Sequence, residues 1–210
     1  MQIILDFGSG NTCKNDKKYI KRMIDELKKV DTGKHKVVIK WQLFKEAGDN
    51  MPLTNDCFNY AYDYAKTLGY KTTASVFDVN SLKFLLQYVI PFVKISCNNE
   101  KYWLIGRVPR NMPVYYSTNN PSEVFPRHSE HLFRLYDAYK LYCVPKYPAE
   151  IEDYKLKNMK GVSDHTVDLE LFNDNPSCEV FEMHYALEDS TGEDADCGIC
   201  KTPSMLKNIL

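Results

Sequence analysis

The sequence predicts a compact (β/α)8 barrel of the TIM type, in which several outer helices of the second half are reduced or missing. Short apolar runs of strand character alternate with helical patterns along the chain, and this alternation is typical of a parallel α/β sheet. Eight such strands can be placed, and eight parallel strands favour a closed barrel over an open sheet. The first two strand-to-strand spacings are roughly 35 residues, as expected for this fold, whereas later ones shrink to roughly 20, too short for a full helix with two loops.

The eight predicted strands are short runs with many β-branched and aromatic residues. They cover residues 3–7, 37–39, 72–76, 92–96, 114–116, 140–143, a brief stretch near Val162, and 179–182. Helices are predicted where apolar residues recur every three or four positions. They cover residues 20–30, 55–68, 80–88 and 129–139, with Gly69 as the C-terminal stop of the second and Ser129 at the start of the last.

Composition and charge are those of a globular, single-domain protein. The 210 residues are 44% hydrophobic and 26% charged, enough to bury one core, and no repeat or linker divides residues 1–210. The net charge of −1 gives no basic field, so we expect neither nucleic acid nor a membrane surface as a partner. No secretory leader is apparent and the seven cysteines are scattered, so we expect a cytoplasmic protein with reduced thiols.

Polar side chains recur where the predicted strands end, which is the face of a (β/α) barrel that carries function. They are Asp6, Lys40, Gln42, Ser75, Lys94, Asn98, Asn99, Ser117, Tyr147, Ser163, His165, Glu182 and His184. Lys40 and Lys94 are flanked by apolar strand residues, and a buried lysine is costly without a partner. A bound phosphate or carboxylate group would satisfy them. The alternative is that each lysine reaches solvent or pairs with Asp6 or Glu182.

Two histidines follow consecutive predicted strands. The imidazoles of His165 and His184 can therefore both point into the barrel mouth, and imidazole is a favoured ligand of divalent first-row metals. Two histidines alone do not make a site, because a catalytic metal usually needs a third protein or substrate ligand. The alternative is a core histidine hydrogen-bonded to the neighbouring Ser163 and Asp164.

Several short motifs occur in one consistent order along the chain. They are Ile39-Lys40-Trp41-Gln42, Ser75-Val76-Phe77-Asp78, Val93-Lys94-Ile95-Ser96, Pro113-Val114-Tyr115-Tyr116-Ser117-Thr118, Tyr147-Pro148, Ser163-Asp164-His165-Thr166 and Glu182-Met183-His184-Tyr185. Each motif is weak alone, whereas their collinear order is specific. On these motifs the chain, from residue 3 to residue 209, resembles the sialic-acid synthase family (N-acetylneuraminate synthases and relatives).

The resemblance implies a metal-assisted enzyme that condenses phosphoenolpyruvate with an N-acetylhexosamine-type aldehyde sugar and releases phosphate. It also implies the role of individual side chains at the strand ends. The implied residues are Lys40, Ser75, Lys94, Ser117 and Ser163 for phosphoenolpyruvate, His165 and His184 for Mn²⁺ or Mg²⁺, and Asp6, Gln42, Tyr147 and Asp196 for catalysis at the sugar.

The sequence departs from the family pattern mainly on the sugar side. Asn99 stands where the family has a glutamate, and an asparagine can orient a sugar but cannot transfer its proton. Asp6 is one methylene shorter than the family's glutamate. We also expect no C-terminal antifreeze-like domain after Leu210, which leaves a homodimer or an accessory subunit to complete the sugar site. A degenerate barrel that binds a phosphorylated or sugar ligand, or acts as a scaffold, without turnover is therefore the alternative function.

Two further motifs leave alternatives open. Cys197-Gly198-Ile199-Cys200 is typical either of unremarkable reduced thiols in a loop or, with Cys178 and either Cys143 or His184 as further ligands, of a zinc knuckle. Gly8-Ser9-Gly10 is compatible with a backbone phosphate cradle and equally with a tight strand-to-helix turn.

Overall fold

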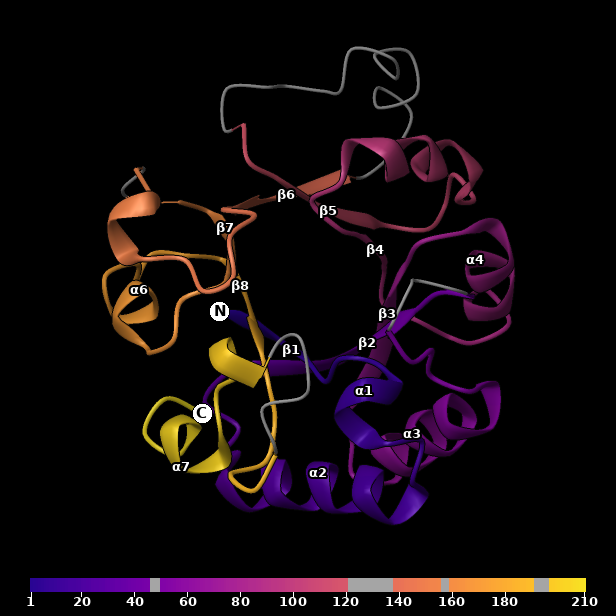
Figure 1. Cartoon of the computed structure of the whole chain (residues 1–210), viewed down its shortest axis with the longest axis horizontal. Coiled ribbons are helices and arrows are strands. Elements are labelled where there is room, and N and C mark those ends of the chain that lie inside the picture. The colour runs from indigo at the N-terminus through magenta and orange to yellow at the C-terminus, as the bar shows by residue number, and fades with distance from the viewer. Residues whose placement is uncertain (46–49, 121–137, 156–158, 191–196) are drawn as a thin grey trace.

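In the computed structural model the chain forms a closed barrel of eight parallel strands, with the helices outside it (Figure 1). The structure describes residues 1–45, 50–120, 138–155, 159–190 and 197–210. Each strand pairs with the next along the chain, and the last pairs with the first. The strands are β1 (Gln2–Asp6), β2 (Lys36–Leu43), β3 (Lys71–Val76), β4 (Val93–Ile95), β5 (Val114–Thr118), β6 (Ala138–Cys143), β7 (Gly161–Asp164) and β8 (Val180–His184). The predicted fold class is confirmed.

The barrel interior is apolar at the bottom and polar at the top. Side chains of a strand alternate between the two faces of the sheet, so every second residue points inward. The lower inward positions form a small cluster of Ile4, Val38, Phe92, Leu141 and Val180. The next inward positions along β1, β2 and β8 are Asp6, Lys40 and Glu182. Asp6 is the register partner of Lys40, and Glu182 is aligned with Ile4 one inward position below Asp6. The apolar cluster therefore forms the floor under the polar side chains at the carboxyl ends of the strands.

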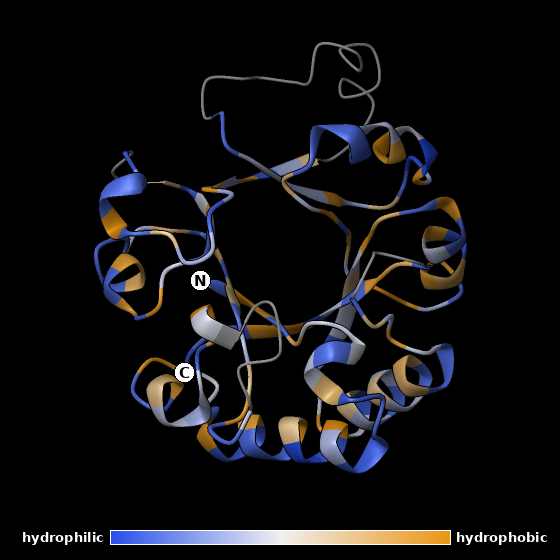
Figure 2. Cartoon of the chain, viewed as in Figure 1, coloured by the Kyte–Doolittle hydropathy of each residue, from blue (hydrophilic) through white to orange (hydrophobic). Residues whose placement is uncertain are grey.

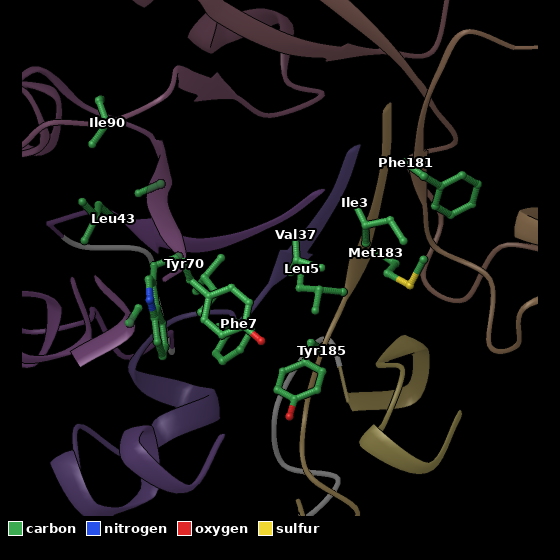
Figure 3. Close-up of a cluster of buried hydrophobic side chains, with 14 of the residues drawn as sticks. Ile3, Leu5, Phe7, Val37, Leu43, Tyr70, Ile90, Phe181, Met183 and Tyr185 are labelled. Atoms are coloured by element: carbon green, nitrogen blue, oxygen red, sulfur yellow. The ribbon is translucent and has the colours of Figure 1, made fainter. Parts of the chain in front are cut away.

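The outward positions of the strands build the larger hydrophobic core against the helices. Figure 3 shows part of this cluster, where Ile3 and Leu5 of β1 lie near Met183 of β8 and near side chains of the neighbouring strands. The outer surfaces of the helices are mainly hydrophilic, as the blue faces in Figure 2 show. This two-sided burial explains why the strands read as nearly continuous apolar runs in the sequence.

Among the residues that the structure describes, full outer helices occur in the first half of the chain only. Helix α2 (Lys17–Val30) begins at the cap Asp16 and buries Ile20, Met23, Ile24 and Leu27 on one face. Helix α3 (Asn55–Thr67) is capped by the Thr54 hydroxyl, and α4 (Val79–Leu85) by the Asp78 carboxylate. The predicted helix over 80–88 thus begins one residue earlier and ends three residues earlier than expected.

In the second half the described connections are short. They contain the 3-10 segments η1 (Asn99–Arg107), η2 (Ile151–Asp153) and η3 (Cys197–Ile199), and the four-residue helices α6 (Glu170–Asn173) and α7 (Pro203–Leu206). The predicted reduction of the outer helices is confirmed for these connections. The predicted helix over 129–139 lies mostly outside the described residues, and at its end it is wrong, because residues 138 and 139 belong to β6 and pair with β5.

The Gly8-Ser9-Gly10 segment is a tight turn between β1 and the short helix α1 (Gly10–Cys13). Gly8 has a φ of +73°, a conformation that favours glycine, and its N–H donates to Asp6 Oδ1 at 3.0 Å. A Cβ on Gly10 would lie 2.6 Å from the backbone oxygen of Pro52. These contacts favour the interpretation as a strand-to-helix turn. Within the described ranges, no helix combines the length and the apolar character needed to cross a membrane.

Candidate functional site at the carboxyl ends of the strands

A cavity of about 260 Å³ opens at the carboxyl ends of the strands. Its walls come from all eight strands or the segments that directly follow them. The lining residues are Asp6, Lys40, Gln42, Ser75, Phe77, Lys94, Ser96, Cys97, Asn98, Ser117, Cys143, Tyr147, Ser163, His165, Glu182 and His184. The structure therefore brings together all the predicted site residues that it describes, except Asn99.

Lys40 is held by two carboxylates on one side of this cavity. Its Nζ lies 2.6 Å from Asp6 Oδ2 and 2.6 Å from Glu182 Oε1, and it donates to Ser75 Oγ at 3.1 Å. Only 3% of the lysine side chain is exposed. Burial alone would lower the pKa of Lys40, but the two carboxylates outweigh burial and raise the pKa above its ordinary value. Of the alternatives open at the sequence level, the ion pair with Asp6 and Glu182 is therefore the one observed.

Lys94 is equally buried but has a different set of partners. Its Nζ donates to Ser117 Oγ at 2.7 Å and to the backbone oxygen of Ile95 at 3.2 Å, and it lies 3.3 Å from Glu182 Oε2. Burial lowers the pKa of Lys94 below its ordinary value, and the positive charge of Lys40 acts in the same direction. The more distant carboxylate offsets this only in part. Two lysines that look alike in the sequence thus have different electrostatic environments.

Glu182 bridges the two lysines and joins them into one network. We call Asp6, Lys40, Lys94 and Glu182 the lysine side of the cavity. Burial would raise the pKa of Glu182, but the two ammonium groups outweigh burial and lower it to about 2. Asp6 also accepts from the side chain of Gln42 at 3.0 Å. In the sequence Glu182 is only a possible partner of the lysines; its spacing of two from His184, on one strand, is the signal that places it in the cavity.

Two imidazoles and an aromatic ring form another part of the cavity wall, which we call the imidazole side: Tyr147, His165 and His184. His165 Nδ1 donates to the backbone oxygen of Val144 at 2.7 Å, and the Tyr147 ring stacks on the His165 ring with a centroid separation of 4.2 Å. The rings of His165 and His184 are 5.4 Å apart, and His184 Nδ1 lies 3.8 Å from Asp6 Oδ2. Both histidines are buried, whereas Tyr147 is 54% exposed.

The imidazole side has the donor chemistry for a divalent metal ion. Because a carbonyl oxygen can only accept, the proton of neutral His165 must lie on Nδ1, and Nε2 is then the basic nitrogen. Among the described residues, no group of three histidine, cysteine or acidic side chains is arranged to hold a metal. The two imidazoles therefore fit an ion that takes its remaining ligands from water or substrate.

Two of the predicted residues are not found in the cavity wall, one because it lies elsewhere and one because it is not described. Asn99 is the first residue of η1 and is exposed, whereas Asn98 lines the cavity and caps η1 by accepting from the Glu100 N–H at 2.9 Å. The strand ends at Ile95, so the chain has already turned away from the mouth when it reaches Asn99. Asp196 lies outside the described residues.

Two cysteines in the cavity wall were not predicted to belong to the site. Cys97 and Cys143 both line the cavity, and a hydrogen bond from Cys143 together with the positive charge of Lys94 lowers the pKa of Cys97 to about 7, although burial opposes the shift. Cys143 Sγ also contacts the His165 ring at 3.9 Å. The sequence contained a weak signal for Cys143 alone, because it ends a predicted strand.

The cysteines discussed for a zinc knuckle are not gathered at one end of the barrel. Cys178 precedes β8 and donates to the backbone oxygens of Lys160 and Val180, whereas Cys200 follows the carboxyl end of that strand. Cys143 lies in the cavity wall at the end of β6. This distribution favours separate thiols.

Comparisons with known proteins identify relatives of this barrel. The model of the NeuB family matches residues 18–210. A sialic acid synthetase from Leptospira borgpetersenii, solved with citrate, superposes with a TM-score of 0.79 at 22% identity, covering 98% of this chain and 80% of that chain. A putative spore coat polysaccharide biosynthesis protein E from Chromobacterium violaceum superposes with a TM-score of 0.75 at 19% identity, covering 99% of this chain and 72% of that chain. A truncated 3-deoxy-D-arabino-heptulosonate 7-phosphate synthase from Thermotoga maritima superposes with a TM-score of 0.68 at 13% identity, covering 99% of this chain and 83% of that chain. At these identities the structures establish the fold. Comparison with curated proteins gave no significant match.

Proposed function

The chain belongs to the NeuB family, and on that basis we propose that it condenses phosphoenolpyruvate with an N-acetylhexosamine-type aldehyde sugar and releases phosphate. The observation that carries this proposal is the composition of one cavity. Buried lysines and serines line it together with two imidazoles. Lysine and serine donors suit an anionic substrate, and imidazoles suit a metal ion.

On the lysine side, the ammonium groups with Ser75, Ser117 and Ser163 provide donors for phosphate and carboxylate oxygens. Because these donors are fixed by buried contacts before the ligand arrives, little reorganisation is needed when negative charge develops. The apolar floor beneath them excludes water from below. The enol carbon of phosphoenolpyruvate forms the new bond to the aldehyde carbon; water then adds at C2, and the tetrahedral adduct loses phosphate. Holding both substrates in one cavity removes the entropic cost of a bimolecular encounter.

On the imidazole side, we propose that His165 and His184 hold Mn²⁺ or Mg²⁺. The ion, when bound, would polarise the aldehyde oxygen of the sugar as a Lewis acid. The hydrogen bond of His165 to the Val144 carbonyl orients its ring, and the exposed Tyr147 ring offers an apolar face and a hydroxyl to the sugar. The side-chain amide of Gln42 donates a hydrogen bond to the Asp6 carboxylate, which holds Gln42 in place.

One observation favours the second candidate, a barrel that binds its ligand without turnover. Among the described lining residues the only carboxyl groups are Asp6 and Glu182, and both are paired with Lys40. A carboxylate held in its ionised form by a lysine is a poor proton donor. Asn99, which is exposed outside the cavity wall, does not replace that function.

The decisive experiment measures phosphate release from phosphoenolpyruvate with a panel of aldehyde sugars and Mn²⁺. We expect release by the wild type and a loss of at least about 100-fold in the His165→Ala variant, as for the removal of a key electrostatic group. His35→Ala, a substitution far from the cavity, is the matched control. Mn²⁺ binding measured by electron paramagnetic resonance tests the metal site independently of turnover. Binding of phosphoenolpyruvate without phosphate release from any sugar would favour the second candidate.

The proposed partner of the barrel stays a prediction. A homodimer, or an accessory subunit that completes the sugar side, would be detected by light scattering coupled to size-exclusion chromatography. Phosphate release by the isolated monomer, in the assay described above, would show that no partner is needed.

A further inference from the structure

Lys201 is a charged side chain that is completely enclosed by protein, although it is not one of the residues found in the cavity wall. Its ammonium nitrogen lies 2.5 Å from the backbone oxygen of Thr166, 3.2 Å from that of Ile199 and 3.1 Å from Asp164 Oδ2. These contacts match the three donors of an ammonium group. A buried ammonium group is costly unless its partners are well placed, so the contacts of Lys201 are committed to the protein itself.

The side chain of Lys201 brackets His165 at the end of β7. Asp164 and Thr166 are the two neighbours of His165 in the sequence, and both contact the ammonium group. Asp164 Oδ1 also accepts from the N–H of Thr166 at 2.7 Å and from its hydroxyl at 2.8 Å, so the two neighbours are bonded to each other. His165 is therefore the middle residue of a short buried segment that is fixed on both sides.

The backbone of Lys201 contacts the strand that carries the other histidine. Its N–H donates to the carbonyl oxygen of His184 at 2.8 Å, and Lys201 pairs with Tyr185 as a parallel bridge directly after β8. The pairing of β7 with β8 ends at Asp164 and Met183, one residue before each histidine. Lys201 thus connects the two strand ends at the point where their own backbone pairing has stopped.

We propose that Lys201 is a positioning residue that locks the ends of β7 and β8 together and so keeps the imidazoles of His165 and His184 at one separation. Their ring centroids are 5.4 Å apart. An ion that binds both rings forms bonds of a narrow range of length, so a displacement of one strand end by a fraction of an ångström would weaken its binding. The inference rests on the proposed function only for the ligand of the two rings, a divalent metal ion.

The test measures Mn²⁺ binding by electron paramagnetic resonance in the wild type, in Lys201→Met and in the double variant Lys201→Met/Asp164→Asn. Lys201→Met leaves the Asp164 carboxylate buried without its cation. The double variant removes that charge as well, which covers the case in which the single variant does not fold. We expect an affinity at least about tenfold lower in both variants, because residues that orient metal ligands have effects of this size.

Leu85→Ala is the matched control for a loss of stability. Leu85 is a buried side chain of α4, which packs against β3 on the side of the barrel away from β7 and β8 (Figure 1). Truncation of a buried leucine destabilises a protein, but Mn²⁺ affinity should stay as in the wild type. An equal fall in Leu85→Ala would show that Lys201 acts only through general stability. Unchanged Mn²⁺ affinity in the double variant would also overturn the proposal.

A measurement on the metal-free protein separates this inference from the proposed function. Nuclear Overhauser effects between ring protons of His165 and His184 report the separation of the two rings. The signal should be present in the wild type and in Leu85→Ala, and it should be lost in the double variant of Lys201 and Asp164. A wild type that shows the signal but does not bind Mn²⁺ would refute the proposed metal site and leave the role of Lys201 intact. A signal that is unchanged in the double variant would refute that role.

Discussion

On the lysine side of the cavity every charged group is buried and has a partner of opposite charge. On the imidazole side, His165 is bonded to a backbone carbonyl and stacked on a ring, His184 lies 3.8 Å from Asp6, and Tyr147 is 54% exposed. The first arrangement joins β1, β2, β4 and β8 into one electrostatic unit. The difference predicts that the lysine side contributes more to the stability of the fold than the imidazole side does.

The largest expected effect is the loss of stability on replacing Lys40 with methionine. The substitution leaves Asp6 and Glu182 buried without their shared cation, which should lower the free energy of unfolding by about 3–5 kcal/mol. Urea unfolding followed by circular dichroism measures the change. Lys160→Met removes the same charge from an exposed ion pair and should change stability by at most about 0.5 kcal/mol. If Lys40→Met and Lys160→Met lowered the free energy of unfolding equally, the buried ion pairs would not be more important for stability than an exposed one.

His165→Ala should destabilise the protein less than Lys40→Met does, but it should abolish the proposed binding of Mn²⁺. It removes one buried hydrogen bond, to the Val144 carbonyl, so we expect a loss of about 1–2 kcal/mol in the free energy of unfolding. The proposed metal site loses one of its two imidazoles, so Mn²⁺ binding should disappear from the paramagnetic resonance titration. Unchanged Mn²⁺ affinity would place the ion elsewhere.

The reactivity of Cys97 reports on the charge of the lysine side. The thiolate is the nucleophile, and a pKa lowered to about 7 means that the rate of alkylation by iodoacetamide should rise through that pH and level off above it. Lys94→Met removes a positive charge that favours the thiolate, so the midpoint should move to higher pH. Peptide mapping by mass spectrometry separates Cys97 from Cys13 and Cys57, which are buried. An unchanged pH midpoint of Cys97 alkylation in Lys94→Met would contradict the electrostatic coupling between the two side chains.

The smallest expected effect on stability is that of Tyr147→Ala. The ring is largely exposed and stacks on one face of His165, a contact worth roughly 0.5–1 kcal/mol. Tyr147→Phe keeps the stack and should leave stability unchanged. If alanine instead destabilises the protein as much as Lys40→Met does, the imidazole side is a structural unit after all.

Much of the fold and the membership of the cavity could be predicted from the sequence, because both follow from local patterns. Apolar runs marked each strand, and short spacings indicated the reduced helices of the second half. Polar residues at the strand ends, such as Ser75 and Ser163, gathered in one cavity because parallel strands all end at the same rim. The start of β6 was missed, since pairing of residues 138 and 139 with β5 depends on a strand distant in sequence.

The sequence by itself determined that this chain forms a barrel and which types of side chain meet at its mouth, since alternation along a strand fixes the face on which each residue lies. Only the tertiary structure decided how those side chains pair. Closure of the barrel brings β8 beside β1, and the Glu182 side chain there contacts Lys40 at 2.6 Å, so the two lysines are not equivalent. The end of β4 at Ile95 carries Asn99 outside the cavity. Contacts between groups far apart in sequence set these partners, and no local pattern encodes them.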